Sequence, residues 1–486
     1  MNSTIEQLNP DRVFYFFAKI CNIPHPSKKE ALLTSYLLTF AKERNLVSAL
    51  DEVGNVLIRK PAFVGYEHLI PVVLQSHIDM VCEKKFSTKH NFDTDPIIPF
   101  VDGDWVKAKG TTLGADDGIG IAVQLAILDS RNIPHGPIEC LFTIDEETGL
   151  TGAFGLKQGF LEGKILLNLD SEDEGQIFIG CAGGRDTIAH LPYQTETVYK
   201  NITALKVKVG GLKGGHSGDD INKGLGNAVK ILNRVLWQLS RQFPIQLSDF
   251  NAGNLRNAIA REGWAIITLQ NDFSLELHNF IDAFQSMIKN EFHVTDPGVF
   301  VTVENAETPL VAIRNSDFLN LINVLYACPH GVITMSPEID NFVETSTNLA
   351  SVRLYPEYLE ITTSQRSSVE SAKQNIVDMV ESAFLLAGAS VSHSDGYPGW
   401  TPNPASRVLN IAVKVYNELF NSNPEVLAIH AGLECGLIGD TYPEMDMISF
   451  GPTIKGAHSP DERLHIPSVS KFWVFTLELL KRIPQR

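Results

Sequence analysis

The sequence predicts an α/β protein in which both ends of the chain form a mainly parallel-sheet domain and a second α/β domain is inserted between them. Three observations support this fold class. Short apolar runs alternate with helical patterns over residues 1–184, as in βαβ units. Strand candidates over residues 185–394 instead alternate between polar and apolar side chains, which is typical of half-exposed strands. The α/β pattern returns over residues 395–486, so we expect the domain of 1–184 and 395–486 to be interrupted by 185–394.

The first part of the chain contains three apolar runs with the length of buried strands. They cover residues 71–76, 138–144 and 164–169. Apolar residues at helical spacing predict helices over 11–21, 28–43 and 117–129. Strands separated by helices favour a largely parallel sheet.

The inserted part and the last part are assigned in the same way. Between 185 and 394 we expect a half-exposed strand over 203–209, a helix over 224–239 and a strand over 265–269, with further elements at 279–289, 299–304, 316–327 and 367–387. A loop-like stretch follows at 394–400. The last part predicts a helix over 408–420, strands over 425–429 and 446–450, and a closing helix over 468–482.

Composition limits the kinds of partner. The 486 residues include 40 Lys and Arg against 57 Asp and Glu, a formal net charge of −17. Such a chain is a poor match for nucleic acid or for anionic lipid, and its carboxylates suit cations instead. The six cysteines are scattered without a CxxC motif, so no disulfide framework is expected. Without an apparent signal sequence or membrane span, we expect a soluble cytoplasmic protein.

Metal-binding residue types follow each of the three apolar strands. His77 and Asp79 come after the first strand, Glu146 and Glu147 after the second, and Asp170 after the third. Because the carboxyl ends of parallel strands meet at one edge, these side chains should gather there. Imidazole and carboxylate together suit zinc, with manganese or cobalt as substitutes.

A further acidic pair and a late histidine complete the pattern. Asp116 and Asp117 stand between glycines just before a predicted helix, and His458 lies on a Gly- and Pro-rich loop after the last strand. Crowded carboxylates repel one another unless cations separate them, and two divalent ions would share a bridging carboxylate. Asp116 is the natural bridge. Each motif alone is an ordinary turn or helix start, so the prediction depends on their combination.

These residues resemble the co-catalytic dizinc peptidase family, which includes aminoacylases, glutamate carboxypeptidase-type enzymes and dipeptidases. The resemblance extends over essentially the whole chain and is strongest with a bacterial dipeptidase branch. The longer stretches that carry it are 113–120, 142–149, 214–221, 343–346 and 451–462. Asp117 is a departure, since some dipeptidases of this branch carry Asn there, although the wider family commonly has Asp.

The resemblance implies two zinc ions per subunit and a role for each residue. Asp116 would bridge the ions, His77 and Asp170 would complete one site, and Glu147 and His458 the other. Glu146 would be the general base. Asp79 would orient the His77 imidazole by a hydrogen bond.

The resemblance also gives roles outside the metal ligands. His216, in Gly-Gly-His-Ser-Gly, would stabilise the developing oxyanion once the inserted domain closes as a lid, in its own subunit or in a neighbour's. Arg366 is a candidate for the substrate's carboxylate and Asn257 for a second substrate contact. Glu434 would read the free amino group.

The activity implied is hydrolysis of unblocked dipeptides, including Xaa-His, through a water bridging two zinc ions with a Glu base. A tripeptidase, aminoacylase or carboxypeptidase of the same family is the alternative, and a non-catalytic metal- or peptide-binding protein is the alternative of another class. A dinucleotide-binding enzyme is disfavoured because Gly118 and Gly120 follow acidic residues that would repel a pyrophosphate. The resemblance also suggests a homodimer.

Overall fold

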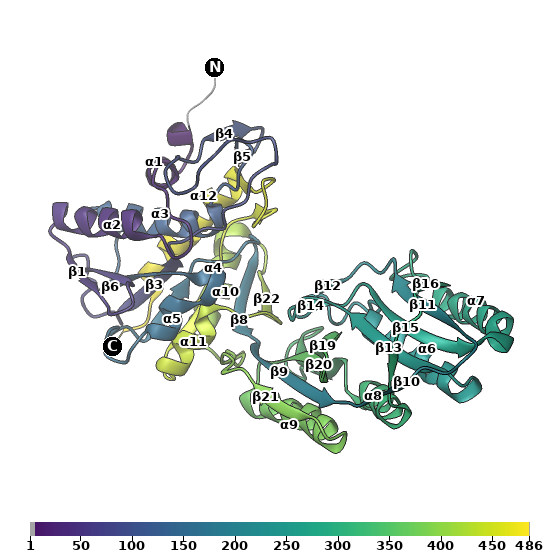
Figure 1. Cartoon of the computed structure of the whole chain (residues 1–486). Coiled ribbons are helices and arrows are strands. Elements are labelled where there is room, and N and C mark those ends of the chain that lie inside the picture. The colour runs from purple at the N-terminus through teal and green to yellow at the C-terminus, as the bar shows by residue number, and fades with distance from the viewer. Residues whose placement is uncertain (1–4, 486) are drawn as a thin grey trace. The chain divides into compact units, whose positions relative to one another are not determined.

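The computed structural model describes residues 5–485, and the chain divides into two compact units (Figure 1). Unit 1 consists of residues 5–180, 400–428 and 433–485, and unit 2 of 181–399 and 429–432. Both chain ends therefore belong to unit 1. The limits of unit 2 differ by a few residues from the expected 185–394, and the short segment 429–432 joins it from the last part of the chain.

Unit 1 is organised around an eight-stranded sheet of order β1-β2-β6-β3-β7-β23-β8-β22. Its strands are β1 (Val47–Leu50), β2 (Val56–Lys60), β6 (Ile138–Thr143), β3 (Val72–His77), β7 (Ile165–Asn168), β23 (Asp446–Ser449), β8 (Gln176–Cys181) and β22 (Glu425–Ile429). The four central strands β6, β3, β7 and β23 are parallel. Every residue of β3, β6 and β7 is buried, as their apolar sequences require. The prediction of a mainly parallel central sheet is confirmed.

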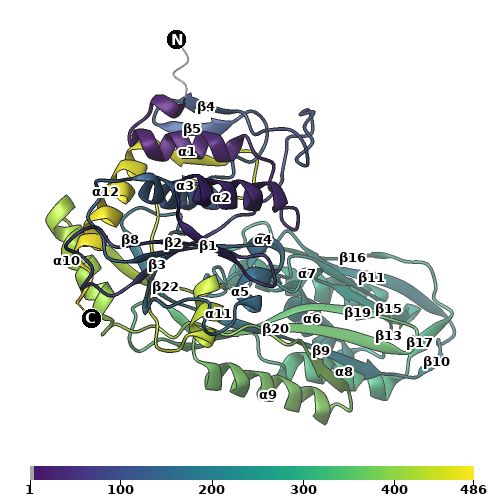
Figure 2. The same ribbon diagram turned by 90° about the vertical axis from the view of Figure 1, so that its left-hand side faces the viewer.

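Helices cover both faces of this sheet, as Figure 1 and Figure 2 show. On one side lie α1 (Asp11–Cys21), α2 (Ala31–Glu43) and α3 (Ala115–Asp129), and on the other α5 (Thr151–Gly155) and α11 (Glu434–Thr441). The remaining helices of unit 1 are η1 (Ile5–Gln7), α4 (Glu146–Gly149), α10 (Arg407–Phe420) and α12 (Ile466–Arg482). The helix predicted from residue 28 begins at Ala31, because Lys28 has a left-handed backbone (φ 67°).

A small four-stranded sheet of order β24-β25-β5-β4 also belongs to unit 1. Its strands are β4 (Pro99–Asp102), β5 (Trp105–Ala108), β24 (Ile454–Lys455) and β25 (Arg463–His465). Arg463 pairs with Lys107 and His465 with Trp105, so the chain after His458 is held by backbone pairing to an early hairpin.

Unit 2 is built on a nine-stranded antiparallel sheet of order β16-β11-β15-β13-β19-β20-β9-β21, with β18 also paired to β19. Its strands are β9 (Gly183–Pro192), β11 (Ile202–Gly210), β13 (Gln246–Ala252), β15 (Gly263–Gln270), β16 (Phe300–Asn305), β18 (Gly331–Met335), β19 (Val343–Leu354), β20 (Tyr358–Ser367) and β21 (Ser390–His393). Two short pairs join β10 (Thr195–Thr197) to β17 (Val311–Ile313) and β12 (Gly215–His216) to β14 (Ala258–Ile259).

One hydrophobic core joins the sheet of unit 2 to its helices. These are α6 (Ala228–Gln242), α7 (Ser274–Glu291), α8 (Asn315–Ala327) and α9 (Glu370–Leu386), with the short η2 (Asn271–Phe273). The helix predicted from residue 224 begins at Ala228, because Gly224 has a positive φ of 68° and Asn227 caps the helix by accepting from Lys230 N at 3.2 Å.

Strands β19, β20 and β9 were not predicted, because many of their buried side chains are polar. Thr187 Oγ1 donates to Gln365 Oε1 at 2.8 Å, and Gln365 Nε2 donates to Thr363 Oγ1 at 2.8 Å, with all three side chains buried. The polar groups of such a network satisfy one another inside the sheet. The strands therefore lack the alternating apolar pattern by which a strand is predicted.

Two further findings concern the whole described chain. No helix among residues 5–485 is both long enough and apolar enough to cross a lipid bilayer. The six cysteines form no disulfide bond with one another.

Candidate active site

The carboxyl ends of the four central strands of unit 1 carry the predicted ligands. His77 is the last residue of β3, Asp170 follows β7, Glu147 stands in α4 just after β6, and His458 lies between β24 and β25, in the segment that follows β23. The parallel register aligns these ends, since His77 is paired with Thr143 at the end of β6. A sheet of this kind delivers side chains to one edge, where α/β proteins bind ligands.

The first group of potential ligands surrounds the His77 imidazole. His77 Nε2 lies 3.0 Å from Asp116 Oδ1 and 3.4 Å from Asp170 Oδ1. Burial would lower the pKa of His77, but Asp170 and Asp116 outweigh it and hold that pKa well above the usual value. These three side chains can offer one ligand atom each to the same ion.

The second group surrounds the imidazole of His458. His458 Nε2 lies 3.2 Å from Asp116 Oδ2 and 3.1 Å from Glu147 Oε2, and these two carboxylates raise the pKa of His458 to about 11. The other oxygen, Glu147 Oε1, is buried without a hydrogen-bond partner. Asp116 belongs to both groups and gives one oxygen to each.

The spacing of these atoms fits two zinc-sized ions. Tetrahedral ligands at about 2.0 Å from an ion are about 3.3 Å apart. The four distances between imidazole nitrogen and carboxylate oxygen are 3.0 to 3.4 Å. The unpartnered Glu147 oxygen and the crowding of buried carboxylates fit the same interpretation, because bound cations would relieve both.

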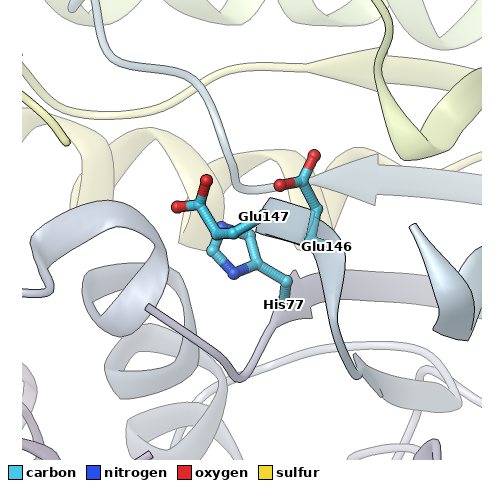
Figure 3. Close-up of side chains that lie close together, drawn as sticks. All are labelled: His77, Glu146 and Glu147. Atoms are coloured by element: carbon cyan, nitrogen blue, oxygen red, sulfur yellow. The ribbon is translucent and has the colours of Figure 1, made fainter. Parts of the chain in front are cut away.

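Glu146 lies beside the two groups without completing either of them. Figure 3 shows its carboxylate and that of Glu147 diverging from adjacent positions of α4, with the His77 ring below both carboxylates in this view. Burial raises the pKa of Glu146 well above its ordinary value, and the carboxylates of Asp170 and Glu434 add to this effect. Glu146, Glu147 and His77 also have ligand atoms within 4.8 Å of one another, so Glu146 is within reach of anything held there.

Asp79 holds the backbone under Glu146 and Glu147. Its carboxylate accepts hydrogen bonds from Glu146 N at 2.9 Å, Glu147 N at 3.2 Å and Ser27 Oγ at 2.7 Å. His77 Nδ1 is closer to the backbone oxygen of Asp79 (3.0 Å) than to its carboxylate (3.4 Å). Asp79 therefore contacts the His77 ring through both its main chain and its side chain. The contact of Asp79 with α4 could not be predicted from the sequence.

Glu462 was not singled out by sequence reasoning as a site residue, although it ends the matched stretch 451–462. Its carboxylate is 3% exposed and accepts from the backbone N–H groups of four successive residues, Leu113 to Asp116. Burial and the nearby Asp116 carboxylate raise the pKa of Glu462 to about 7 despite these bonds. Asp117, the residue after Asp116, is buried, and its carboxylate accepts a hydrogen bond from Gly120 N at 3.1 Å.

Glu434 also lies at the carboxyl ends of the central strands. It begins α11, and its Oε2 accepts from Gln75 Nε2 of β3 at 2.6 Å and from Thr143 Oγ1 of β6 at 2.7 Å. Its other oxygen, Oε1, is buried without a partner. Burial raises the pKa of Glu434 to about 7.

Three of the predicted residues, His216, Asn257 and Arg366, belong to unit 2. His216 pairs with Ala258 across β12 and β14, next to Asn257, whose backbone oxygen accepts from Ser217 N at 2.8 Å. The N–H groups of Gly218 and Asp219 each lie 3.3 Å from His216 Nδ1. Asp219 Oδ2 also lies 3.3 Å from His216 Nδ1. The side chain of Asn257 is exposed and has no described hydrogen bond.

Arg366 is a buried cation with an unused donor. It is 7% exposed, its Nη1 donates to Tyr397 Oη at 2.8 Å, and its Nε has no hydrogen-bond partner. A buried guanidinium nitrogen without an acceptor is costly unless a ligand supplies one.

Three residues near Arg366, namely Ser346, His430 and Asp219, were not predicted as site residues. Across β19 and β20, Arg366 pairs with Ser346, whose hydroxyl lies 2.7 Å from His430 Nε2. Burial and the Arg366 charge lower the pKa of His430 to about 3, so this ring is neutral. Burial raises the pKa of Asp219, but the contact with His216 and the Arg366 charge outweigh it, and that pKa lies below its ordinary value. No sequence motif connects these distant residues.

Comparison with known proteins defines the class. Peptidase family M20/M25/M40 matches residues 73–482. The cytosol non-specific dipeptidase of Escherichia coli strain K12 is 46% identical over 487 residues, covering 100% of both chains. The crystal structure of aminoacylhistidine dipeptidase from Vibrio alginolyticus matches with a TM-score of 0.93 and 43% identity, over 100% of this chain and 99% of that one. Aminopeptidase PepT from Bacillus cereus shares the fold at 15% identity and a TM-score of 0.57, over 98% and 99%.

The chain belongs to peptidase family M20/M25/M40. It is therefore a peptidase and a hydrolase, as the sequence predicts.

Proposed function

We propose that this protein is a dizinc dipeptidase that hydrolyses unblocked dipeptides, including Xaa-His. The main support for this proposal is the pair of ligand groups that share Asp116, in which imidazole nitrogens lie 3.0 to 3.4 Å from carboxylate oxygens. Paired sites with a shared carboxylate are a recurrent arrangement in hydrolytic enzymes. Three carboxylates and two imidazoles at one sheet edge are a donor set suited to divalent cations.

The proposed ligand set assigns each residue to one role. His77 and Asp170 would hold one zinc ion, Glu147 and His458 the other, and Asp116 both. When bound, the two ions would supply an activated water and polarise the scissile carbonyl. Manganese or cobalt would fit the same nitrogen and oxygen donors.

Glu146 would act as the general base. Its carboxylate would take a proton from the attacking water on one Oε atom and pass it to the leaving amine. Asp79 supports this role, because its bonds to the N–H groups of Glu146 and Glu147 fix the start of α4. His216 would donate a ring N–H to the oxygen on which negative charge develops.

The two ends of a dipeptide would be read by groups of opposite charge. Glu434 would accept the substrate ammonium on Oε1, the oxygen that lacks a partner. Arg366 would hold the C-terminal carboxylate through Nε, the nitrogen that lacks an acceptor, and Asn257 would add a substrate contact. Recognition of both free ends favours dipeptides over N-acylated substrates and longer peptides.

The names of the relatives support the finer assignment. One full-length relative is a cytosol non-specific dipeptidase and one matched structure is an aminoacylhistidine dipeptidase. From these we infer a cytoplasmic enzyme that acts on Xaa-His. The resemblance also suggests a homodimer, which light scattering on the purified protein would test.

The proposed function is tested by metal analysis together with a substrate panel. The purified protein should hold two zinc ions per chain, and chelation should abolish a turnover that zinc restores. Xaa-His and other dipeptides should be cleaved faster than tripeptides or N-acyl amino acids. Preference for tripeptides, N-acyl amino acids or the C-terminal residues of longer peptides would favour the alternative enzymes of the family. Binding of metal or peptide with no cleavage would contradict the enzyme assignment.

A further inference from the structure

We propose that Glu462 is a positioning residue whose carboxylate fixes the backbone from which Asp116 reaches both ions. The inference rests on the proposed metal site but concerns a residue that binds neither metal nor substrate. Glu462 is absent from the groups of side chains able to hold an ion.

The backbone before α3 needs an acceptor from elsewhere in the chain. The first N–H groups of a helix have no partner within it. Gly114, the residue before α3, has a left-handed backbone (φ 68°) and supplies no side-chain cap, and Asp116 has a non-helical conformation (φ −82°, ψ 110°). The segment 113–116 therefore cannot satisfy its own amides.

The carboxylate of Glu462 meets this need. Oε2 accepts from Leu113 N at 2.7 Å and Gly114 N at 3.1 Å, while Oε1 accepts from Ala115 N at 2.7 Å and is 3.4 Å from Asp116 N. Successive amides that converge on one anion form a strong and directional cradle. Both oxygens are used by amides, which explains why Glu462 is not itself a ligand.

The cradle connects two ligand-bearing segments. Glu462 stands four residues after His458, and its own N–H donates to Ser459 O at 3.0 Å, so both residues share one compact turn. The next residue, Arg463, begins β25, which is paired with β5, and Leu464 is fully buried. A single buried carboxylate thus couples the segment of Asp116 to the segment of His458, and Asp116 and His458 meet at one ion-sized site.

The test replaces one oxygen of the Glu462 carboxylate. In Glu462→Gln, the new NH₂ group would face two backbone N–H groups that need an acceptor. We expect zinc affinity and kcat each to fall by about 10- to 100-fold, the usual effect of losing a partner that orients a ligand. Because Glu462 does not touch substrate, KM should change less than threefold.

A matched variant separates positioning from general destabilisation. Glu139 is also a buried glutamate of unit 1, accepting from Glu162 N and Gly163 N at 2.8 Å, but at the amino end of β6, away from the ligands. Glu139→Gln should lower the melting temperature of the metal-free protein and leave zinc affinity and kcat near wild type. Glu462→Asp, which keeps the charge, should recover part of the zinc affinity.

The outcomes distinguish this inference from the proposed function. Zinc affinity is measured by chelator competition on folded protein, whose integrity is checked by near-UV circular dichroism. Wild-type zinc affinity and kcat in Glu462→Gln would overturn the inference, as would equal losses in Glu139→Gln. If the wild-type chain itself bound no zinc and cleaved no dipeptide, the proposed function would fail instead.

Discussion

The two units of this protein carry candidate functional residues of opposite charge. Unit 1 gathers carboxylates and two imidazoles at the carboxyl ends of four parallel strands. Unit 2 holds a buried arginine, two histidines and one partly exposed aspartate around an antiparallel sheet. The first arrangement suits cations and the second suits an anion such as a peptide carboxylate.

The difference also shows how each kind of sheet builds a site. The carboxyl ends of parallel strands all lie at the same edge of the sheet. The topology alone therefore brings together the short motifs that follow each strand. In the antiparallel sheet of unit 2, residues come together by strand register and by a distant segment, as when Ser346 pairs with Arg366 and bonds to His430. The comparison predicts that changes at the ligand groups and Glu146 of unit 1 alter chemistry and that changes at Arg366 of unit 2 alter substrate affinity.

The largest effect should come from Glu146, the proposed base in unit 1. Glu146→Gln keeps the shape of the side chain and removes its proton acceptor. We expect kcat to fall about 10²- to 10⁴-fold with zinc content and KM nearly unchanged, as steady-state kinetics and metal analysis would show. The control is Glu444→Gln, since the Glu444 side chain is 86% exposed in the same unit. A kcat within threefold of wild type would remove Glu146 from the mechanism.

A smaller effect should come from the cation in unit 2. Arg366→Lys keeps the charge but loses the Nε donor and the planar fork. We expect kcat/KM to fall about 10- to 100-fold, mainly through KM, for dipeptides with a free carboxylate. Dipeptide amides should be affected much less. Arg256→Lys is the control, because Arg256 is exposed and bonds to Asp186. An equal loss for acids and amides would show that Arg366 does not read the carboxylate.

The smallest effect concerns how the helices of unit 1 are braced. Asp129 is the last residue of α3. Its carboxylate accepts hydrogen bonds from Nε of Arg44, the residue after α2, at 2.8 Å and from Arg12 of α1. Burial raises the pKa of Asp129, but the bonds to the two arginines outweigh it and hold that pKa below its ordinary value. The ionised form is therefore favoured by folding, and its contribution is present above pH 4 and lost as pH falls through the lowered pKa.

Asp129→Asn should accordingly lower the free energy of unfolding by about 1 kcal/mol at pH 7 and by less near pH 3. Urea unfolding at both pH values measures the difference. Asp102→Asn, which removes one exposed pair with Lys107, should change stability by less than about 0.5 kcal/mol at either pH. A loss for Asp129→Asn that is independent of pH would show that the arginine contacts do not account for it.

Much of unit 1 could be predicted from sequence because its signals are local. The apolar strands at 71–76, 138–144 and 164–169 are observed as β3, β6 and β7, and the helix over 11–21 has the predicted bounds. Their burial on both faces produces continuous apolar runs, and a candidate ligand stands within three residues after each run. Helix starts at 28 and 224 were wrong, because a positive φ at Lys28 and Gly224 stops the helix from beginning there.

The sequence by itself predicted the parallel-sheet class of unit 1 and the candidate ligands from motifs of a few residues, and the family resemblance added Glu146 as the candidate base. Only the tertiary structure decided which groups support them. Asp79 reaches the amides of α4, Glu462 reaches amides almost 350 residues earlier in the chain, and Ser346 links Arg366 to His430. The physical reason is that a lone carboxylate or hydroxyl has no periodic pattern, and its role depends on the distant backbone groups it satisfies.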